Sequence, residues 1–350
     1  MSSRHANIPI FVPHLGCPND CVFCDQRAIT GKTSFCIGEV ESGIERALST
    51  LSADDVQIAF FGGSFTGIER DDMIALLKIA KKYIDAGAVR SVRLSTRPDY
   101  IDEEILDILA SYGVTDIELG IQSMSENVLE ACRRGHHVED SISACKLIKS
   151  EKYSFNLVGQ MMVGLPSATS EDEIMTAKML CSLGIDAARV YPTVVLAKTE
   201  LAEMMMRGDY LPLSVEEGAK RAAAVLEVLS EAGIPCIRCG LCATDDLSDK
   251  SHVLAGAYHP AMGELSQNAL FLERIIKELD RLEPGSFSGV TIYVARGCVS
   301  KASGQGKRNK IAISEKYKIL PGRVFIKEDE TLHGYDVRVK TTKKEKVSGE

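Results

Sequence analysis

The sequence lacks several features that would place it in large classes of proteins. It has no tryptophan, and no stretch approaches the roughly 18 to 20 consecutive apolar residues that a membrane helix needs, which excludes an integral membrane protein. Its opening, MSSRHANIPIFVPH, has neither the apolar core of a signal peptide nor an Arg/Ser-rich targeting pattern. We therefore expect a cytoplasmic protein without a membrane partner.

Basic residues are not in excess either. The 41 Lys and Arg face 49 Asp and Glu, a net charge of −8, which argues against binding nucleic acid with the whole surface but not against a local patch. Cysteine, in contrast, is abundant, with 11 residues. Because the number is odd and several spacings are tight, metal ligands are more plausible than disulfides in a reducing compartment.

The 350 residues suffice for one large domain of about 200 to 250 residues plus a smaller one. Short apolar runs alternate with amphipathic stretches from residue 8 to about 195. The expected strands are 8–13, 56–61, 91–95, 116–121, 155–163 and 188–194, and helical patterns include 71–84, 102–112 and 170–183. Six strand-helix units predict an α/β protein with a parallel sheet.

Two arrangements of that sheet fit the alternation. A doubly wound sheet is one, but the residues with chemical potential cluster just after the strands, as at the rim of a barrel. We therefore favour a partial (β/α)6 barrel.

The repeat ends after a long Ala/Glu-rich helical pattern at 214–232. We expect a barrel domain over 1–235 and a smaller C-terminal α+β domain over 236–350, with a helix at 264–282, a strand at 290–295 and a terminal pair of strands. From Lys301 onward 13 Lys and Arg face 7 Asp and Glu, so positive charge is concentrated there. The segment 301–310, KASGQGKRNK, could contact a phosphate backbone, although a merely solvated face is the commoner explanation.

The strongest chemical signal is Cys17-Pro-Asn-Asp-Cys21-Val-Phe-Cys24, a CxxxCxxC motif directly after the first expected strand. Three thiolates on one short loop can hold three corners of an iron-sulfur cube and leave the fourth iron open to a ligand, which could receive one electron from it. Zinc is the alternative, but a structural zinc site takes four ligands, and the nearest additional candidates are His14 and Cys36.

The motif after this strand resembles the signature of the radical S-adenosylmethionine (radical SAM) superfamily, whose fold is a partial six-unit barrel. FFGGSFTGI at 60–68 is similar to the superfamily's glycine-rich stretch after the second strand. The resemblance implies that Gly62, Gly63 and Ser64 meet the amino end of the methionine moiety, where a Cβ would leave no room. The third position is often Glu in the family and is Ser64 here.

Further segments extend the resemblance. STRPDYI at 95–101 and ELGIQSM at 118–124 match places that meet the cosubstrate's carboxylate and ribose, which implies Ser95, Arg97, Glu118 and Gln122 as contacts. NLVGQMMVGLP at 156–166 matches the fifth-strand region, where Gly164 would let the chain approach the adenine. Alternatively, Arg97 forms an ordinary ion pair within its loop. Glu118 could instead belong to an internal polar network, since a buried acid needs a partner.

STRPDYID, ELGIQSM, RRGHHVED and the segment 189–213 resemble the radical SAM half of the Elongator catalytic subunit family, which modifies wobble uridine in tRNA. The likeness covers about residues 8–240, and no acetyl-CoA-binding pattern follows it. It implies a radical SAM enzyme in which Cys17, Cys21 and Cys24 hold a 4Fe-4S cluster that reductively cleaves S-adenosylmethionine, and the resulting 5′-deoxyadenosyl radical abstracts hydrogen from a substrate.

The expected partners are an RNA substrate and a reductant protein such as flavodoxin or ferredoxin. One alternative is an iron-sulfur or zinc protein that binds RNA without turnover. A coproporphyrinogen-dehydrogenase-like enzyme for a small molecule is another.

The roles of two further groups of residues are not decided by the sequence. Cys236, Cys239 and Cys242 have the CxxCxxC spacing of a second metal site, but a buried strand with alternate residues on one face would produce a similar pattern. Arg134 and His136 in the RRGHH element either line the substrate side or cap a helix.

Overall fold

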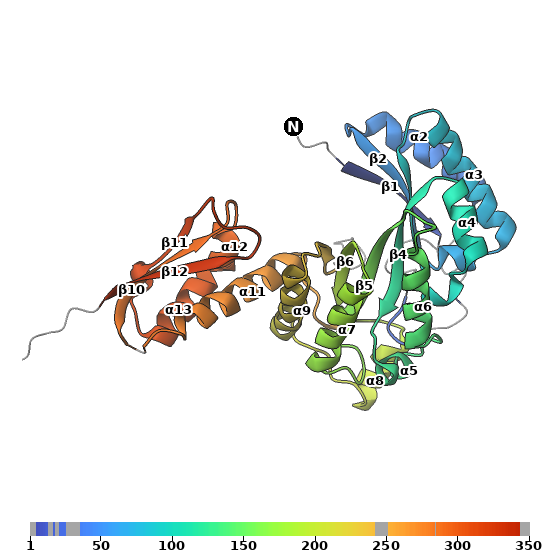
Figure 1. Cartoon of the computed structure of the whole chain (residues 1–350). Coiled ribbons are helices and arrows are strands. Elements are labelled where there is room, and N and C mark those ends of the chain that lie inside the picture. The colour runs from blue at the N-terminus through green and yellow to red at the C-terminus, as the bar shows by residue number, and fades with distance from the viewer. Residues whose placement is uncertain are drawn as a thin grey trace, which may run out of the picture.

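The computed structural model describes residues 5–12, 17, 21–25, 36–241, 251–283 and 285–343. Its main element is a seven-stranded sheet in the order β1-β2-β3-β4-β5-β6-β8, in which all neighbours are parallel. The strands are β1 (His5–Val12), β2 (Asp55–Gly62), β3 (Ser91–Thr96), β4 (Val114–Gln122), β5 (Asn156–Val163), β6 (Ala187–Pro192) and β8 (Cys236–Cys239). The sheet curls into an open half barrel (Figure 1).

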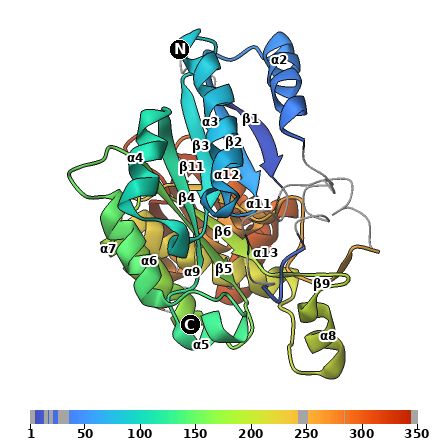
Figure 2. The same cartoon turned by 90° about the vertical axis from the view of Figure 1, so that its right-hand side faces the viewer.

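Helices cover the convex face of the half barrel (Figures 1 and 2). They are α2 (Val40–Thr50), α3 (Arg70–Asp85), α4 (Glu103–Ser111), α6 (Val138–Ile148), α7 (Ser170–Ser182) and α9 (Val215–Glu231). Their apolar stripes and the convex side of the strands form the main core, which includes Leu76 and Leu77 of α3 and Ile58 and Phe60 of β2. Burying each such side chain stabilises the fold by about 1.5 to 3 kcal/mol.

Side chains at the helix starts fix where these helices begin. The Asp102 carboxylate accepts from the Ile105 N–H at the start of α4, and the Thr169 hydroxyl accepts from the Asp172 N–H at the start of α7. Ser214 does the same at α9. Each cap satisfies a backbone donor that has no partner within its helix, which is typically worth about 1 kcal/mol.

Smaller elements stand at the rim formed by the carboxyl ends of the strands. The 3-10 turns η1 (Ile37–Glu39), η2 (Phe65–Gly67) and η3 (Pro98–Tyr100) precede α2, α3 and α4. Helices α5 (Glu126–Ala131) and α8 (Glu200–Arg207) and the antiparallel ribbon of β7 (Val194–Leu196) and β9 (Val253–Gly256) complete this end.

The C-terminal unit has a separate small core. Helix α11 (Met262–Leu279) packs along α9 and leads into a three-stranded sheet in the order β11-β10-β12. Its elements are β10 (Phe287–Val294), α12 (Val299–Ser303), η4 (Gln305–Lys307), α13 (Arg308–Tyr317), η5 (Pro321–Arg323), β11 (Val324–Glu328) and β12 (Val337–Lys343). No helix in the described part of the chain has both the length and the hydrophobicity to cross a bilayer.

The predicted α/β partial barrel with a smaller C-terminal α+β unit is confirmed. The sheet differs from the prediction at its last edge, because β8 adds a seventh parallel strand, pairing with β6 from Ala188↔Cys236 to Val190↔Cys239. The sheet therefore continues past the expected boundary at residue 235. At four residues, β8 is too short for a periodic pattern, and only its pairing with β6 makes it a strand.

Candidate active site

The cysteine motif lies at the rim, just beyond β1. Val22, between Cys21 and Cys24, donates its N–H to the Cys132 carbonyl after α5 (3.2 Å) and accepts at its own carbonyl from the Leu201 N–H of α8 (2.8 Å). The Val22 side chain is buried in a small core with Leu201. These contacts fix the CxxC part of the motif to two helices at the rim, whereas residues 18–20 lie outside the described part.

A guanidinium group touches the middle thiol. Arg134 donates from Nη1 to Cys21 Sγ at 3.1 Å and from Nη2 to the Gly120 carbonyl at the end of β4. Arg97, directly after β3, is also buried, and it forms a bidentate pair with Asp99 at 2.8 and 2.9 Å. Two positive charges therefore stand beside the cysteine loop.

Several buried polar nitrogens at this place have no hydrogen-bond partner in the described part of the chain. They are Nη1 of Arg97, Nε of Arg134 and both ring nitrogens of His136. Burial, together with Arg134 and Arg97, lowers the pKa of His136 to about 3, so the ring is neutral near pH 7. Buried polar atoms normally have partners, and the two free guanidinium N–H groups are suited to an anionic ligand.

Burial and neighbouring charges act in opposite directions on the Cys17 thiol. Burial raises the pKa of the Cys17 thiol, and Cys21 adds to this effect, whereas Arg97, a backbone hydrogen bond from Ser64 and Arg134 act in the opposite direction. No three His, Cys, Asp or Glu side chains of the described residues are arranged to hold a metal ion. The donor set and its two neighbouring cations fit an anionic iron-sulfur cluster.

The glycine-rich stretch lies where β2 meets the cysteine loop. Gly62 has φ +115°, and a Cβ there would stand 3.0 Å from the Val12 carbonyl oxygen of β1. Only glycine allows this backbone approach. Gly63 is half-buried in the following bend. The Ser64 hydroxyl is fully buried, bonded to Thr96 Oγ1 at 2.8 Å and accepting from the Arg97 N–H, so its side chain joins the ends of β2 and β3.

Glu118 lies on the concave face of the sheet and is fully buried. Its carboxylate contacts Arg93 at 2.9 Å, Arg189 at 2.8 and 2.9 Å, and the Gln160 amide at 2.7 Å. Ser95 lies opposite Glu118 in the register and accepts from the same amide at 3.4 Å. Three hydrogen-bond donors and the ion-pair contact from Arg189 Nε surround both oxygens, so Glu118 belongs to an internal polar network. A direct contact of Glu118 with the cosubstrate stays a prediction.

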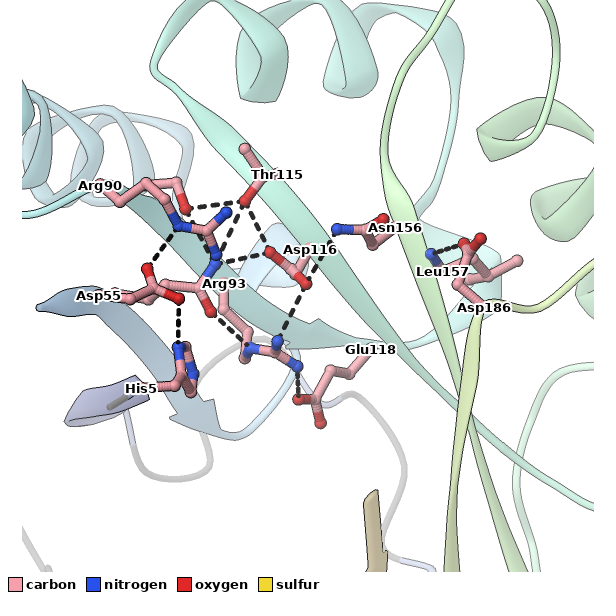
Figure 3. Close-up of polar contacts among 12 residues, drawn as sticks. His5, Asp55, Arg90, Arg93, Thr115, Asp116, Glu118, Asn156, Leu157 and Asp186 are labelled. Carbon is pink, nitrogen blue, oxygen red and sulfur yellow. Dashed lines mark hydrogen bonds and ion pairs between the residues drawn. The ribbon is translucent and has the colours of Figure 1, made fainter. Parts of the chain in front are cut away.

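The network continues across neighbouring strands (Figure 3). Arg93 also binds Asp116 at 2.9 Å, and Asp116 accepts from the Gln57 amide of β2 at 2.7 Å. These polar side chains share the concave face. The interior of the half barrel is therefore lined by ion-paired side chains on the strands that lead up to the cysteine loop.

Gln122 ends β4 in an unusual backbone conformation. Its φ is +68°, and the register with β5 shifts between Gly120 and Gln122. A non-glycine residue in this region is uncommon and often marks a functional site. A Cβ at Gly120 would stand 3.1 Å from the Gln122 amide nitrogen, so this side chain folds back over the strand end.

Gly164 follows β5 at the same rim, with φ +77°, and is buried. Its backbone N–H donates to Glu173 of α7 and its carbonyl accepts from the Tyr210 hydroxyl. The rim therefore unites the cysteine motif with Gly62 to Ser64, Arg97, Gln122 and Gly164, whereas Ser95 and Glu118 lie on the concave face below it.

Some residues at the rim were missed or left undecided from the sequence. The sequence allows two roles for Arg134, lining the substrate side or capping a helix. It does not reveal the contact with Cys21, because the two residues are 113 positions apart. Glu173 had a visible signal, because it stands at helical spacing with the buried residues Thr176, Ala177 and Leu180 on α7. A carboxylate on a buried helical stripe indicates a partner in the fold.

The second cysteine group is only partly described, since Cys242 lies outside the described residues. Cys236 and Cys239 pair in register with Ala188 and Val190, and both pack against the main core. Burial raises the pKa of Cys236 to about 12, so its thiol is protonated near pH 7. Strand β8 is only half-buried, with Ile237 exposed between the two thiols, so it is not the buried strand considered as the alternative, and a second metal site at these cysteines stays a prediction. Of the additional zinc candidates, Cys36 is exposed before η1, and His14 lies outside the described part.

Comparison with known families decides the identity of the fold. The model of the radical SAM superfamily matches residues 11–180, and that of the radical SAM C-terminal domain matches residues 185–271. This chain belongs to the radical SAM superfamily. The superfamily uses a 4Fe-4S cluster and S-adenosylmethionine, which are therefore the cofactors of this chain, and the first match includes the cysteine motif.

Individual relatives place the chain near the Elongator family. An uncharacterized protein of Methanocaldococcus jannaschii is 30% identical over 229 residues, covering 62% of this chain and 70% of that protein. The tRNA uridine(34) acetyltransferase of the same organism is 37% identical over 148 residues, covering 40% of this chain but 27% of the enzyme. This chain thus spans about a quarter of that acetyltransferase.

A solved structure agrees at the level of the fold. The archaeal Elp3 of Methanocaldococcus infernus, with an N-terminal deletion, superposes with a TM-score of 0.58 at 21% identity, over 80% of this chain and 64% of that chain. At this identity the likeness concerns the fold. The predicted resemblance to the Elongator radical SAM domain is confirmed by the sequence relatives and this neighbour together.

Proposed function

We propose that this chain is a radical SAM enzyme in which Cys17, Cys21 and Cys24 bind the 4Fe-4S cluster. The observation that carries the proposal is the rim itself, where the cysteine motif, two buried guanidinium groups and a glycine with positive φ in close contact with β1 meet at the carboxyl ends of parallel strands. Ligands of parallel α/β folds bind at this edge.

When bound, the reduced cluster supplies one electron that splits the sulfonium of S-adenosylmethionine into methionine and a 5′-deoxyadenosyl radical, which takes a hydrogen atom from the substrate. The protein's part is to place the reacting groups and exclude water.

Individual roles follow from the available atoms. Arg97 uses Nε and Nη2 for Asp99 and keeps Nη1 for the carboxylate of S-adenosylmethionine. Gly62, Gly63 and Ser64 offer backbone groups to the methionine amine, so the serine that replaces the family's glutamate acts without its side chain. Gln122 is assigned to the ribose. Ser95 lies below the rim and supports Gln160.

The cluster assignment is tested by iron and sulfide analysis after anaerobic reconstitution of Cys17→Ala, Cys21→Ala and Cys24→Ala. Cys36→Ser is the matched control, because Cys36 is an exposed thiol close in sequence. We expect each alanine variant to lose the cluster and the control to retain about four irons per chain. In the wild type, addition of S-adenosylmethionine should change the electron paramagnetic resonance spectrum of the reduced cluster. Full iron loading of Cys21→Ala contradicts the assignment.

We further propose RNA as the substrate class, with a protein such as flavodoxin or ferredoxin as the electron donor. The RNA proposal is supported by the similarity to archaeal tRNA uridine(34) acetyltransferases and by the C-terminal unit. There, Lys307 and Arg308 are exposed at the start of α13, and no ion pair in the described part involves either of them. Unpaired cations beside a helix N-terminus favour contact with phosphate.

RNA binding is tested with the double variant K307Q/R308Q and an electrophoretic mobility assay on bulk tRNA at several salt concentrations. The control is K81Q/K82Q, an adjacent pair on α3 that is bound to Asp85 and Glu41. We expect the first variant to weaken binding and to reduce the salt dependence, and the control to match the wild type. Equal binding by all three proteins contradicts the role of this segment, and no binding by the wild type contradicts RNA as the substrate.

A further inference from the structure

The loop after β5 is held by side chains from other elements. Gly164 has both backbone polar groups bound: its N–H donates to Glu173 Oε1 of α7 at 2.6 Å, and its carbonyl accepts from the Tyr210 hydroxyl at 2.6 Å. Tyr210 lies after α8 and is buried. The position of one glycine is therefore set from two sides by residues 9 and 46 positions away in the chain.

Glu173 is itself held by a third element. Its side chain is 3% exposed, and Arg221 of α9 binds both carboxylate oxygens, with Nε at 2.8 Å from Oε2. The same guanidinium donates from Nη2 to the Ala168 carbonyl at 3.1 Å, further along the loop. Burial raises the pKa of Glu173, and Arg221 and the Gly164 N–H oppose this effect. A buried carboxylate is stable only with such partners, so the pair fixes both ends of the loop together.

The space around Gly164 is crowded on the side where a side chain would stand. Its φ is +77°, and a Cβ added there would stand 2.5 Å from Leu213 Cδ1. The next residue, Leu165, packs in a small buried core with Val22 of the cysteine motif and with Tyr210. The loop after β5 and the cysteine loop thus share one core, and a shift of either is transmitted to the other.

We propose that Glu173, Arg221 and Tyr210 are positioning residues that fix the Gly164 loop relative to the cysteine loop, so that the adenine end of S-adenosylmethionine is held at a set distance from the cluster. The inference rests on the proposed function, because it assumes that this loop receives the adenine. None of the three side chains needs to touch the cosubstrate. They act through the backbone of Gly164 and Ala168.

The test compares Tyr210→Phe and Arg221→Lys with the wild type, each anaerobically reconstituted and checked for iron content and thermal stability. Tyr210→Phe removes one hydroxyl and keeps the ring, so the core around Leu165 remains filled. The control is Tyr153→Phe, in which a half-buried tyrosine far along the chain from this loop loses hydrogen bonds to Glu103 and Asp107 on α4. Equilibrium dissociation constants are measured for S-adenosylhomocysteine, which contains adenine, and for methionine, which does not.

We expect both variants to raise the dissociation constant of S-adenosylhomocysteine by about three- to tenfold, the effect of losing one or two hydrogen bonds, while iron content and methionine affinity stay at the wild-type level. The control should match the wild type for both ligands. Unchanged S-adenosylhomocysteine affinity in Tyr210→Phe overturns the inference, as does an equal loss of affinity for methionine. If Arg221→Lys fails to fold, Tyr210→Phe decides alone.

The outcomes separate the two proposals. A wild-type protein that holds the cluster but binds neither S-adenosylmethionine nor S-adenosylhomocysteine contradicts the proposed function. A wild-type protein that binds both, with variants that bind equally well, contradicts only the positioning role.

Discussion

Arg134 and Cys21 are 113 residues apart in the sequence and in direct contact, with the guanidinium Nη1 at 3.1 Å from the thiol sulfur. A second nitrogen of the same side chain binds the Gly120 carbonyl at the end of β4. Arg134 therefore ties the cysteine loop to the strand end that also carries Gln122. Iron-sulfur clusters bind cysteine as thiolate, and a guanidinium beside the sulfur complements the negative charge of such a cluster.

Replacing Arg134 with Gln should weaken cluster binding. Hydrogen bonds to charged groups contribute about 1.5 to 3 kcal/mol, so we expect a lower iron content after reconstitution and faster loss of iron to a chelator. Arg207→Gln is the control, because Arg207 is an exposed arginine on α8 that binds Glu200 and Asp209. Identical chelator kinetics for Arg134→Gln and wild type would show that the contact with Cys21 is dispensable.

Glu118→Gln should destabilise the fold. The substitution leaves Arg93 and Arg189 buried beside a neutral amide, and breaking a buried ion pair typically costs about 3 to 5 kcal/mol. Thermal unfolding under anaerobic conditions measures the effect. Glu103→Gln on the exposed surface of α4 should leave the melting temperature within about 1 °C of the wild type, since surface pairs contribute little. A melting temperature for Glu118→Gln equal to that of the control contradicts the buried network.

Gly62→Ala should disturb the proposed ligand site in two ways, through a steric clash of the new Cβ and through backbone strain at positive φ. The new Cβ would meet the Val12 carbonyl at 3.0 Å, whereas at Gly87, which also has positive φ, nothing lies within 4 Å. Gly87→Ala is thus a matched control for strain alone, which costs about 1 to 3 kcal/mol. We expect Gly62→Ala to reduce S-adenosylmethionine affinity and Gly87→Ala to keep it. Equal affinity in both variants would remove Gly62 from the proposed ligand site.

His136 predicts a pH dependence of stability. Its folded pKa of about 3 lies below the ordinary value of 6.5, so the unfolded chain binds the proton more readily and stability falls as the pH drops below about 6.5. Between pH 7 and pH 5 the loss amounts to about 2 kcal/mol, at 1.36 kcal/mol per pH unit. Urea unfolding of wild type and His136→Gln at both pH values isolates this contribution. An equal pH effect in the two proteins would mean that His136 is not held neutral in the fold.

The parts of the fold that depend on local periodicity could be predicted from the sequence. The expected helix at 71–84 corresponds to α3 (Arg70–Asp85), and the strand at 116–121 to β4 (Val114–Gln122), because apolar spacing and capping residues act over a few positions. Strand β8 was missed because its pairing with Ala188 and Val190 is a tertiary contact.

The candidate site shows the same division. Cys17, Cys21 and Cys24 could be proposed as cluster ligands from the sequence because they share one short loop. Gly62 could be proposed as a site residue because it stands in a glycine-rich motif. Glu118 was assigned to the cosubstrate by resemblance, but the partners that occupy its oxygens come from β3, β5 and β6. Long-range partners of this kind decide whether a buried carboxylate is available to a ligand, and no sequence pattern within one strand contains them.

The central claim is that this chain uses its cysteine motif to cleave S-adenosylmethionine. The most direct measurement is the amount of 5′-deoxyadenosine formed when the reconstituted protein is incubated anaerobically with S-adenosylmethionine and dithionite. We predict product from the wild type and from Cys36→Ser, and none from Cys21→Ala. No product from a wild-type protein with a full cluster and bound S-adenosylmethionine, or equal product from Cys21→Ala, would contradict the claim.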